Sequence, residues 1–299
     1  MVTVLGPTAT GKTRLAARLA ALLNGEVISA DSRQVYRGMD IGTGKDLADY
    51  VVDGKQVPYH LVDIAEPGTE YNVFSFQNDF LKAYAGIRQR GHLPVMCGGT
   101  GLYLEAVLGG YRLQQVPENT ALRAKLEQRS HEELIALLKS YGPLHNTTDV
   151  TQRSRTLRAI EIREYEKSHP VKEQLPQIRS VNFGISFPRE EVRRRITVRL
   201  KQRLENGMLE EVQHLLEKGL QPEQLIFYGL EYRYVTQYVT GELSFNEMFI
   251  KLNTAIHQFS KRQMTWFRRM EKKGIPIHWI DGHLPEEEKV AVCLKVMNG

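Results

Sequence analysis

The sequence contains little cysteine and no long apolar run. Its two cysteines, Cys97 and Cys293, lie far apart and neither belongs to a CxxC pair. This excludes a disulfide framework and a zinc finger, and it favours a reducing cytoplasm. No apolar run approaches the roughly 20 residues of a membrane-spanning helix, so no membrane partner is expected. The N-terminus leads directly into a glycine-rich loop, so no signal peptide is expected.

The composition is otherwise that of a folded protein, but its charge is uneven. The 299 residues are 41% hydrophobic and 25% charged, enough for one large domain or two modest ones. Residues 1–110 carry 10 lysines and arginines against 11 acidic residues, residues 111–200 carry 17 against 11, and residues 201–299 carry 13 of each. The basic middle third is either a solvated helical surface or a docking face for a polyanion.

The first hundred residues alternate between short apolar runs and helical patterns. We expect strands at 2–5, 26–30, 60–64 and 93–97, and helices at 12–23 and 74–90. Such alternation predicts a parallel sheet with helices on both faces.

From about Tyr111 the pattern becomes helical. We expect helices at 122–129, 131–140 and 156–167, then strands at 181–187 and 275–280 and long helices at 190–218 and 245–273. The predicted organisation is one α/β domain, residues 1–112 and 181–299, interrupted by an all-helical insertion at 113–180.

Residues 6–13, GPTATGKT, match the phosphate-binding pattern GxxxxGK[ST]. Glycines allow backbone amides to curl around phosphate oxygens, and the following helix adds its dipole. Lys12 supplies a positive charge, and the Thr13 hydroxyl can hold magnesium. The loop therefore predicts a di- or triphosphate site, a chance match in a glycine turn being the weaker alternative.

Asp31 follows the run at 26–30 and is expected at the carboxyl edge of the sheet, where ligands bind in such folds. It could bind magnesium, accept a proton or simply cap a turn. Ser32 and Gln34 offer hydrogen bonds of the kind that read a base edge. Asp63 is a weaker candidate for a carboxylate on the metal side.

Several clusters could contact phosphate or merely form charged helix faces. Arg155 and Arg158 share a helical face. Residues 261–269, KRQMTWFRR, mix cations with aromatic rings, which suits phosphate contact and core anchoring. The arginines between 189 and 199 could clamp a departing phosphate. The glycine turn at 98–101 indicates either tight packing or ligand contact.

Taken together, these motifs resemble those of the tRNA dimethylallyltransferase family. GPTATGKT, DSRQVY, GMDIGTGK, CGGTGLY and KRQMTWFRR occur in family order from residue 6 to residue 269. The resemblance implies a P-loop fold like that of nucleotide kinases, with a helical insertion that grips the tRNA anticodon arm. It also implies transfer of a dimethylallyl group from dimethylallyl diphosphate to N6 of the adenosine 3′ to the anticodon, with magnesium and release of diphosphate.

The resemblance also assigns residues. Asp31 would be the general base, and Thr8 would form a hydrogen bond near the reacting centre. The residues expected to bind diphosphate are Gly6, Pro7, Thr8, Ala9, Thr10, Gly11, Lys12, Thr13 and Arg233, with Thr13 also holding magnesium. The residues expected to bind tRNA are Asp31, Ser32, Arg33, Gln34, Thr100, Arg123, Arg155, Arg158, His257, Lys261 and Arg262. We expect a cytoplasmic monomer.

The chain departs from the family pattern at Tyr59, at Asp46 and at Glu231, which stands where the family has glycine. Three alternatives stay open: a small-molecule kinase with Asp31 as its base, an RNA-binding protein with a nucleotide-gated switch, and a prenyltransferase for free adenine nucleotides. The basic middle third favours an acceptor the size of tRNA.

Overall fold

The computed structural model describes residues 1–144, 147–170 and 176–298. The chain forms two compact units, one made of Met1–Tyr111 with Gln177–Gly299 and the other of Arg112–Pro176. Each is described separately below.

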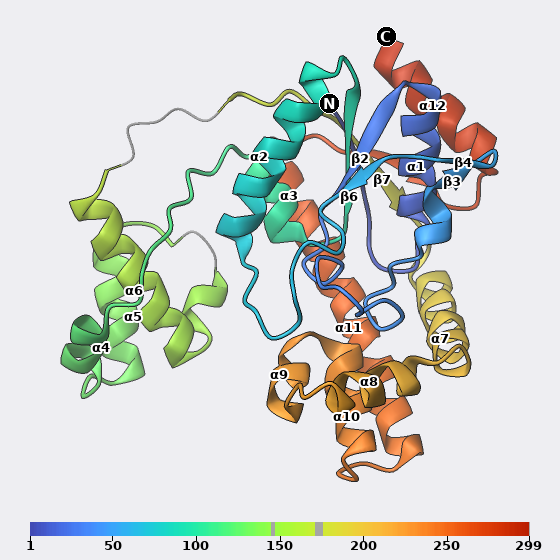
Figure 1. The fold of residues 1–299 in the computed structure, drawn as a ribbon. Coiled ribbons are helices and arrows are strands. Elements are labelled where there is room, and N and C mark those ends of the chain that lie inside the picture. Colours follow the sequence, from blue (N-terminus) through green and yellow to red (C-terminus); the bar gives the residue numbers. More distant parts are fainter. Residues whose placement is uncertain (145–146, 171–175, 299) are drawn as a thin grey trace. The chain divides into compact units, whose positions relative to one another are not determined.

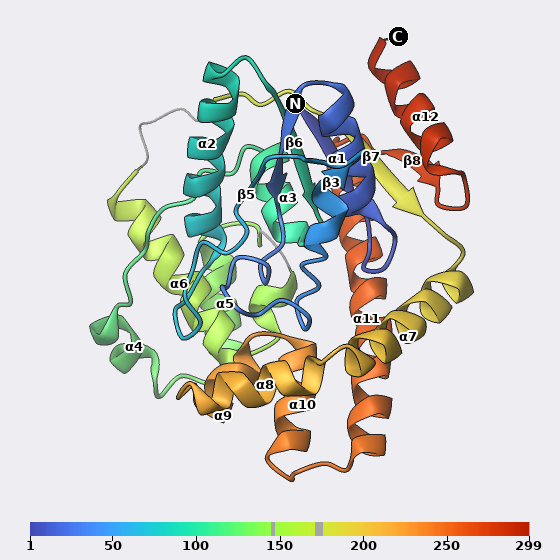
Figure 2. The same ribbon diagram turned by 45° about the vertical axis from the view of Figure 1, so that its right-hand side comes forward.

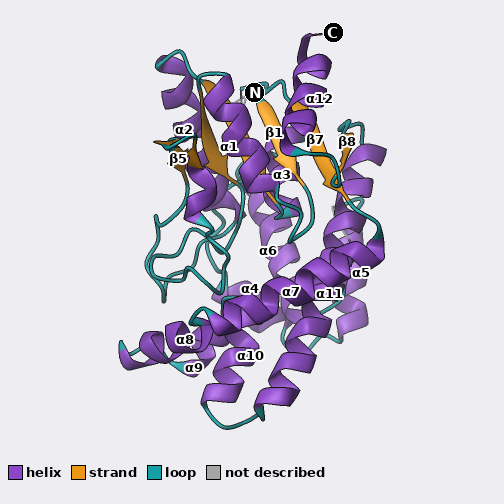
Figure 3. Cartoon of the chain, turned by 90° about the vertical axis from the view of Figure 1, so that its right-hand side faces the viewer, coloured by secondary structure: helices purple, strands orange, loops and turns teal. Residues whose placement is uncertain are grey.

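The first unit is built on a six-stranded parallel sheet (Figure 3). Its strands, in spatial order, are β5 (Tyr59–His60), β2 (Gly25–Ser29), β6 (Leu93–Gly98), β1 (Val2–Leu5), β7 (Val181–Ser186) and β8 (His278–Asp281). A separate antiparallel hairpin joins β3 (Val51–Val52) to β4 (Lys55–Gln56). The central strands β1, β2 and β6 are almost entirely buried, which explains why they read as continuous apolar runs.

Helices cover both faces of the sheet. Helices α1 (Lys12–Leu22) and α12 (Glu286–Asn298) pack on one face, together with the 3₁₀ turn η1 (Leu47–Tyr50). Helices α2 (Val73–Gln89), α3 (Gly101–Leu108) and the second half of α11 (Phe245–Lys272) pack on the other. The predicted α/β class is confirmed.

A layer of further helices forms a second core within this unit (Figures 1 and 2). It contains α7 (Arg189–Glu205), α8 (Met208–Glu217), α9 (Pro222–Phe227), α10 (Leu230–Val239) and the first half of α11. Val35, Tyr36 and Met39 belong to the same core. The helical layer therefore packs against the loop that leaves β2, at the carboxyl edge of the sheet.

Two predicted elements differ in the structure. The helix expected at 190–218 is two helices, because Gly207 takes a left-handed conformation with φ 98° and restarts the chain as α8. The strand expected at 60–64 ends at His60, because Leu61 and Asp63 have φ of 62° and 55°. The turn so formed lets the Asp63 amide donate to the Gln34 carbonyl oxygen.

The second unit is helical throughout its described residues. It contains α4 (Thr120–Leu126), α5 (His131–Ser140), the 3₁₀ turn η2 (Thr147–Val150) and α6 (Arg153–Ser168). Its small core centres on Leu126, Leu134, Leu138 and Ile160. In neither unit is any described helix long and apolar enough to cross a membrane.

Candidate active site

The phosphate loop joins β1 to α1. Ala9 and Gly11 take left-handed conformations, with φ of 63° and 81°, which turn successive amides inward. The buried Thr10 hydroxyl donates to the Pro7 carbonyl oxygen at 2.9 Å and closes the turn. The first amides of a helix have no intrahelical acceptor, and the first turn of α1 carries no acidic residue. The loop can therefore bind an anion at the positive end of the helix dipole.

Lys12 and Thr13 follow this loop and lie against the ends of the neighbouring strands. Burial lowers the pKa of Lys12, while Cys97 and the carboxylates of Asp31 and Asp46 act in the opposite sense. Burial raises the pKa of Cys97 to about 12, partly offset by Lys12 and by a hydrogen bond with Thr13. A Cβ on Gly99 would lie 3.5 Å from the Lys12 side chain and 3.2 Å from the Gly6 carbonyl oxygen, so Lys12 and the phosphate loop lie against the glycine turn that follows β6.

The turn that carries Asp31 is fixed by the glycine motif of the next strand. The Asp31 carboxylate accepts the Arg33 amide at 2.9 Å. The Ser32 amide donates to the Thr100 hydroxyl oxygen at 3.1 Å, and the Thr100 amide donates to the Ala30 carbonyl oxygen. Asp31, Ser32 and Thr100 are thus brought together although 68 residues separate Ser32 from Thr100.

Helix α11 holds the phosphate loop and the glycine turn at residues 98–101 together through Gln263. Its side-chain oxygen accepts the Thr8 amide at 2.9 Å, and its nitrogen donates to the Gly99 carbonyl oxygen at 2.9 Å. A Cβ on Gly99 would lie 2.6 Å from that nitrogen, and a Cβ on Gly101 would overlap the Trp266 ring. The glycine turn is therefore needed for tight packing against α11. Sequence reasoning missed Gln263, although it is the third residue of KRQMTWFRR.

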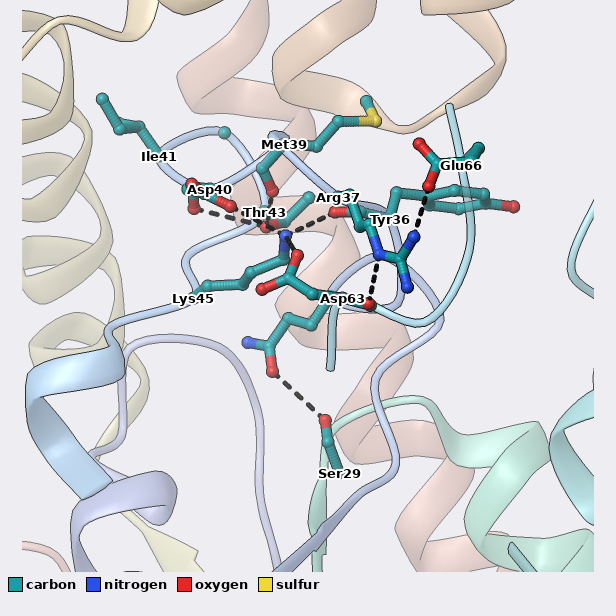
Figure 4. A network of polar contacts seen from close by, with 12 residues as sticks. Ser29, Tyr36, Arg37, Met39, Asp40, Ile41, Thr43, Lys45, Asp63 and Glu66 are labelled. Carbon is teal, nitrogen blue, oxygen red and sulfur yellow. Dashed lines mark hydrogen bonds and ion pairs between the residues drawn. The ribbon is translucent and has the colours of Figure 1, made fainter. Parts of the chain in front are cut away.

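The loop that follows Asp31 is held by Lys45, whose side chain is fully buried. Its ammonium donates to the Tyr36 carbonyl oxygen and to the carboxylates of Asp40 and Asp63 (Figure 4). Asp63 is therefore one of two carboxylate partners of Lys45. The lysine of GMDIGTGK stabilises the loop.

Glu211 holds the same loop from helix α8. Its carboxylate accepts the amides of Asp40, Ile41 and Gly42 at 2.7–3.0 Å. It also accepts the Tyr232 hydroxyl at 2.6 Å. A partly buried acidic side chain thus takes the role that a bound anion has in other loops with several converging amides.

Gln34 is engaged within the protein at both ends of its amide. Its oxygen accepts the Ser29 hydroxyl at 3.2 Å, and its nitrogen donates to the Gly44 carbonyl oxygen at 3.0 Å. The structure therefore uses Gln34 to join the end of β2 to the loop around residue 44.

Three arginines of α7, spaced four residues apart, face the phosphate loop and its neighbours. Arg195 donates to the Ala9 carbonyl oxygen at 2.9 Å. Arg199 pairs with Asp46 at 2.6 Å, and its charge contributes to the lowered pKa of Lys12. Arg203 lies 3.6 Å from the Glu231 carboxylate, and burial lowers the pKa of Arg203 to about 10.

Other basic residues point elsewhere. Arg193 and Arg194 pair with Glu190 and Glu191 on their own helix. Arg233 is exposed on α10, and among the described residues no contact joins it to the phosphate loop. Among these arginines, Arg195 and Arg199 have partners at or beside the phosphate loop, and the contact of Arg233 with diphosphate stays a prediction.

The remaining predicted tRNA contacts are spread over both units. In the first unit, Lys261 and Arg262 are exposed on α11. His257 contacts Thr197 at 3.3 Å, and burial lowers the pKa of this histidine.

In the second unit, two of the predicted tRNA-binding arginines are bound to a carboxylate. Arg123 and Arg158 bond to Glu161 at 2.7 and 3.1 Å, and the Glu161 side chain is only 1% exposed. Arg155 is exposed. Within this unit, therefore, Arg123 and Arg158 hold α4 and the preceding segment onto α6, while Arg155 is open to solvent.

Comparison with known proteins extends these observations. The model of the family described as IPP transferase matches residues 34–270. A protein of Bacteroides fragilis named tRNA dimethylallyltransferase 2 is 60% identical over 291 residues, 97% of this chain and 95% of that protein. The solved tRNA isopentenylpyrophosphate transferase of Bacillus halodurans is 31% identical, with a TM-score of 0.72 over 100% of this chain and 95% of the other.

A eukaryotic dimethylallyltransferase, solved acting on tRNA, shares the fold at 21% identity, with a TM-score of 0.79 over 100% of this chain and 79% of that one. The family predicted from the motifs is confirmed, and the kinase alternative has no comparable support. The chain belongs to the IPP transferase family.

Proposed function

We propose that this protein transfers a dimethylallyl group from dimethylallyl diphosphate to N6 of the adenosine 3′ to the anticodon in tRNA. The observation that carries the proposal is the glycine turn at residues 98–101, which lies against Lys12 and the phosphate loop and also holds the turn that carries Asp31. A carboxylate next to an anion site is unfavourable for binding a polyanion alone, but it is the group that a proton transfer requires. Family membership and the names of the relatives support the same reaction.

The proposed transfer forms one bond, breaks one bond and moves one proton. The N6 lone pair attacks C1 of the allyl group, the C1–O bond breaks, and its electron pair leaves with diphosphate. Asp31 accepts the proton that N6 loses, and Thr8, whose amide is fixed by Gln263, stands near the reacting centre. The acceptor base must leave its stack to reach this site.

Lys12, the loop amides from Gly6 to Thr13, Arg195 and Arg199 would bind the diphosphate. Arg199 pairs with Asp46, whose side chain is 54% exposed, so a diphosphate oxygen can replace that carboxylate. Cations aimed at the leaving group stabilise the negative charge that grows there in the transition state.

The residues present fit a magnesium ion that is held mainly by the substrate. Among described residues, no group of three histidine, cysteine or acidic side chains could hold a metal. Magnesium commonly takes substrate phosphates and few protein ligands, and the Thr13 hydroxyl at the start of α1 would be one. When bound, the ion would neutralise charge on the diphosphate.

For tRNA, we propose that Arg33, Ser32 and Thr100 line the acceptor site and that His257, Lys261 and Arg262 contact the RNA from α11. In the insertion, exposed Arg155 is the best placed of the predicted arginines to contact phosphate in the anticodon arm. Acting on tRNA is consistent with a place in the cytoplasm. Oligomeric state plays no part in the proposed chemistry.

The test is incubation of the full chain with unmodified tRNA, magnesium and labelled dimethylallyl diphosphate, followed by nucleoside analysis. We expect label on the adenosine 3′ to the anticodon, and a loss of at least a hundredfold in turnover for Asp31→Asn with little change in tRNA affinity. Asp53→Asn is the control, since Asp53 is exposed and paired with Arg18 away from the loop. ATP-dependent phosphorylation of a small molecule with no label on RNA would overturn the proposal.

A further inference from the structure

An aromatic ring stands exposed beside the turn that carries Asp31. Phe227, the last residue of α9, is 59% exposed, more than any other large apolar side chain in the described part of the chain. The Arg33 guanidinium lies over its ring, 5.7 Å from the centroid. Because the Arg33 amide bonds to the Asp31 carboxylate, the ring and the acidic side chain are linked through one residue.

The backbone on both sides of this ring is fixed. The next residue, Tyr228, is buried, accepts the Gly68 amide at 2.5 Å through its hydroxyl and packs on Tyr36 at 4.6 Å. Gly229 then takes φ 127°, and a Cβ there would lie 3.6 Å from Arg33. Phe227 therefore cannot turn inward without moving Tyr228 out of the helical core.

An exposed ring on a fixed backbone suits a flat partner. Proteins recognise unpaired bases by stacking them on aromatic rings and arginine planes, and arginine also attracts the phosphate that follows each base. Phe227 and Arg33 offer both surfaces beside the predicted acceptor site. The edge-on contact of Phe227 with Tyr228, at 5.9 Å between centroids, leaves ring surface open.

We infer that Phe227 and Arg33 form a stacking subsite for the unpaired base next to the acceptor adenosine of the RNA substrate. The inference rests on the proposed function. When the acceptor base leaves the stack to reach Asp31, its neighbour loses a stacking partner, and the Phe227 ring replaces that partner. The subsite would thereby favour RNA whose acceptor adenosine lies in a single-stranded loop.

The test uses an anticodon stem-loop RNA with 2-aminopurine at one or the other nucleotide flanking the acceptor adenosine. Stacking quenches this fluorophore, so the full chain should quench one of the two RNAs on binding. Phe227→Ala and Phe227→Leu should lose the quenching and weaken RNA binding about tenfold, the effect of one base–aromatic stack. Phe227→Trp should retain both, and the KM for dimethylallyl diphosphate should stay unchanged in all three.

Phe245→Ala is the matched control, because Phe245 is 46% exposed and packs edge-on against Tyr238 at the start of α11. Thermal unfolding of each variant separates loss of stacking from loss of fold. Phe227→Leu and Phe227→Trp both retain a large apolar side chain, so the comparison between them isolates the aromatic ring. Equal quenching and equal RNA affinity for wild type and Phe227→Leu would overturn the subsite while leaving transfer of the label intact. Quenching that depends on Phe227, with no label transferred by wild type, would instead overturn the proposed reaction and retain the subsite.

Discussion

The arginines of helix α7 and those of residues 112–176 differ in what they face. Arg195 and Arg199 reach the phosphate loop and the exposed carboxylate of Asp46. Arg123 and Arg158 instead converge on the buried carboxylate of Glu161. Arginine bound to a buried acid stabilises a fold, whereas arginine facing an open loop remains available to an incoming anion. Basic residues alone, therefore, do not identify a binding surface.

The net charge follows the same division. Residues 112–176 carry 11 lysines and arginines against 9 acidic residues, whereas residues 177–200 carry 6 against 2. Most of the basic excess of the middle third therefore lies in the unit that holds the phosphate loop, largely on α7. The helical insertion itself is therefore nearly balanced in charge, because the basic segment 111–200 crosses the boundary between the units.

Among the charged residues in this comparison, the largest effect is expected from Arg199→Ala. Losing a cation aimed at the leaving group should reduce kcat/KM for dimethylallyl diphosphate about a hundredfold. Steady-state kinetics at saturating tRNA measures this change. Arg194→Ala is the control on the same helix, since Arg194 pairs with Glu191. Equal losses in the two variants would contradict the distinction between the open and the paired arginines of α7.

The second prediction concerns Glu26 in β2, whose carboxylate pairs with Arg90, His60 and His92. Hydrogen bonds from Arg90, aided by His60 and His92, lower the pKa of Glu26 to about 2 against the opposing effect of burial. Because the folded-state pKa is depressed, the stabilisation is present above pH about 4.5 and is lost as pH falls towards about 2. Its size is about 2 kcal/mol after allowance for solvent screening, since Arg90 is 48% exposed.

Urea unfolding of wild type and Glu26→Gln at neutral and acidic pH measures the stabilisation that the ionised Glu26 side chain contributes. Wild type should lose stability on acidification from pH about 5 to about 3, and the variant should lose about 2 kcal/mol less over the same range. Parallel curves would show that the cluster adds no pH-dependent stability.

A smaller loss is expected from Glu161→Gln in the second unit. Removing the charge between Arg123 and Arg158 should destabilise this unit by about 1 kcal/mol, because both arginines stay partly solvated. Hydrogen exchange should increase in α6 while the amides of β1 and β6 stay protected. If the KM for dimethylallyl diphosphate also rose in Glu161→Gln, a purely structural role of Glu161 would be contradicted.

The smallest effect is expected from Arg155→Ala. This exposed side chain should contribute one phosphate contact, so its removal should weaken tRNA binding a few-fold and reduce the salt slope by about 1. Binding measured over a range of salt concentrations gives both values. An unchanged slope would remove Arg155 from the RNA interface, and Glu132→Ala, on an exposed acid of α5, serves as the control.

The local parts of the site could be predicted from sequence. The phosphate loop, its flanking strand and helix, and Asp31 at the end of β2 each depend on residues close together in the chain. Gln263 could not be placed, because its partners Thr8 and Gly99 lie 255 and 164 residues away. The break at Gly207 was missed because the apolar pattern continues across it, and Glu161 reads as an ordinary surface acid of a helix.

The brace formed by Gln263 also sets the order in which the protein can mature during synthesis. A ribosome that has released β1 and α1 has released the phosphate loop but not the acceptor for its Thr8 amide, which comes 255 residues later. The nascent chain therefore lacks this contact of the anion site until α11 has left the exit tunnel as far as Gln263. Fragments that stop before residue 263 contain every residue of the loop but lack the side chain that accepts its Thr8 amide.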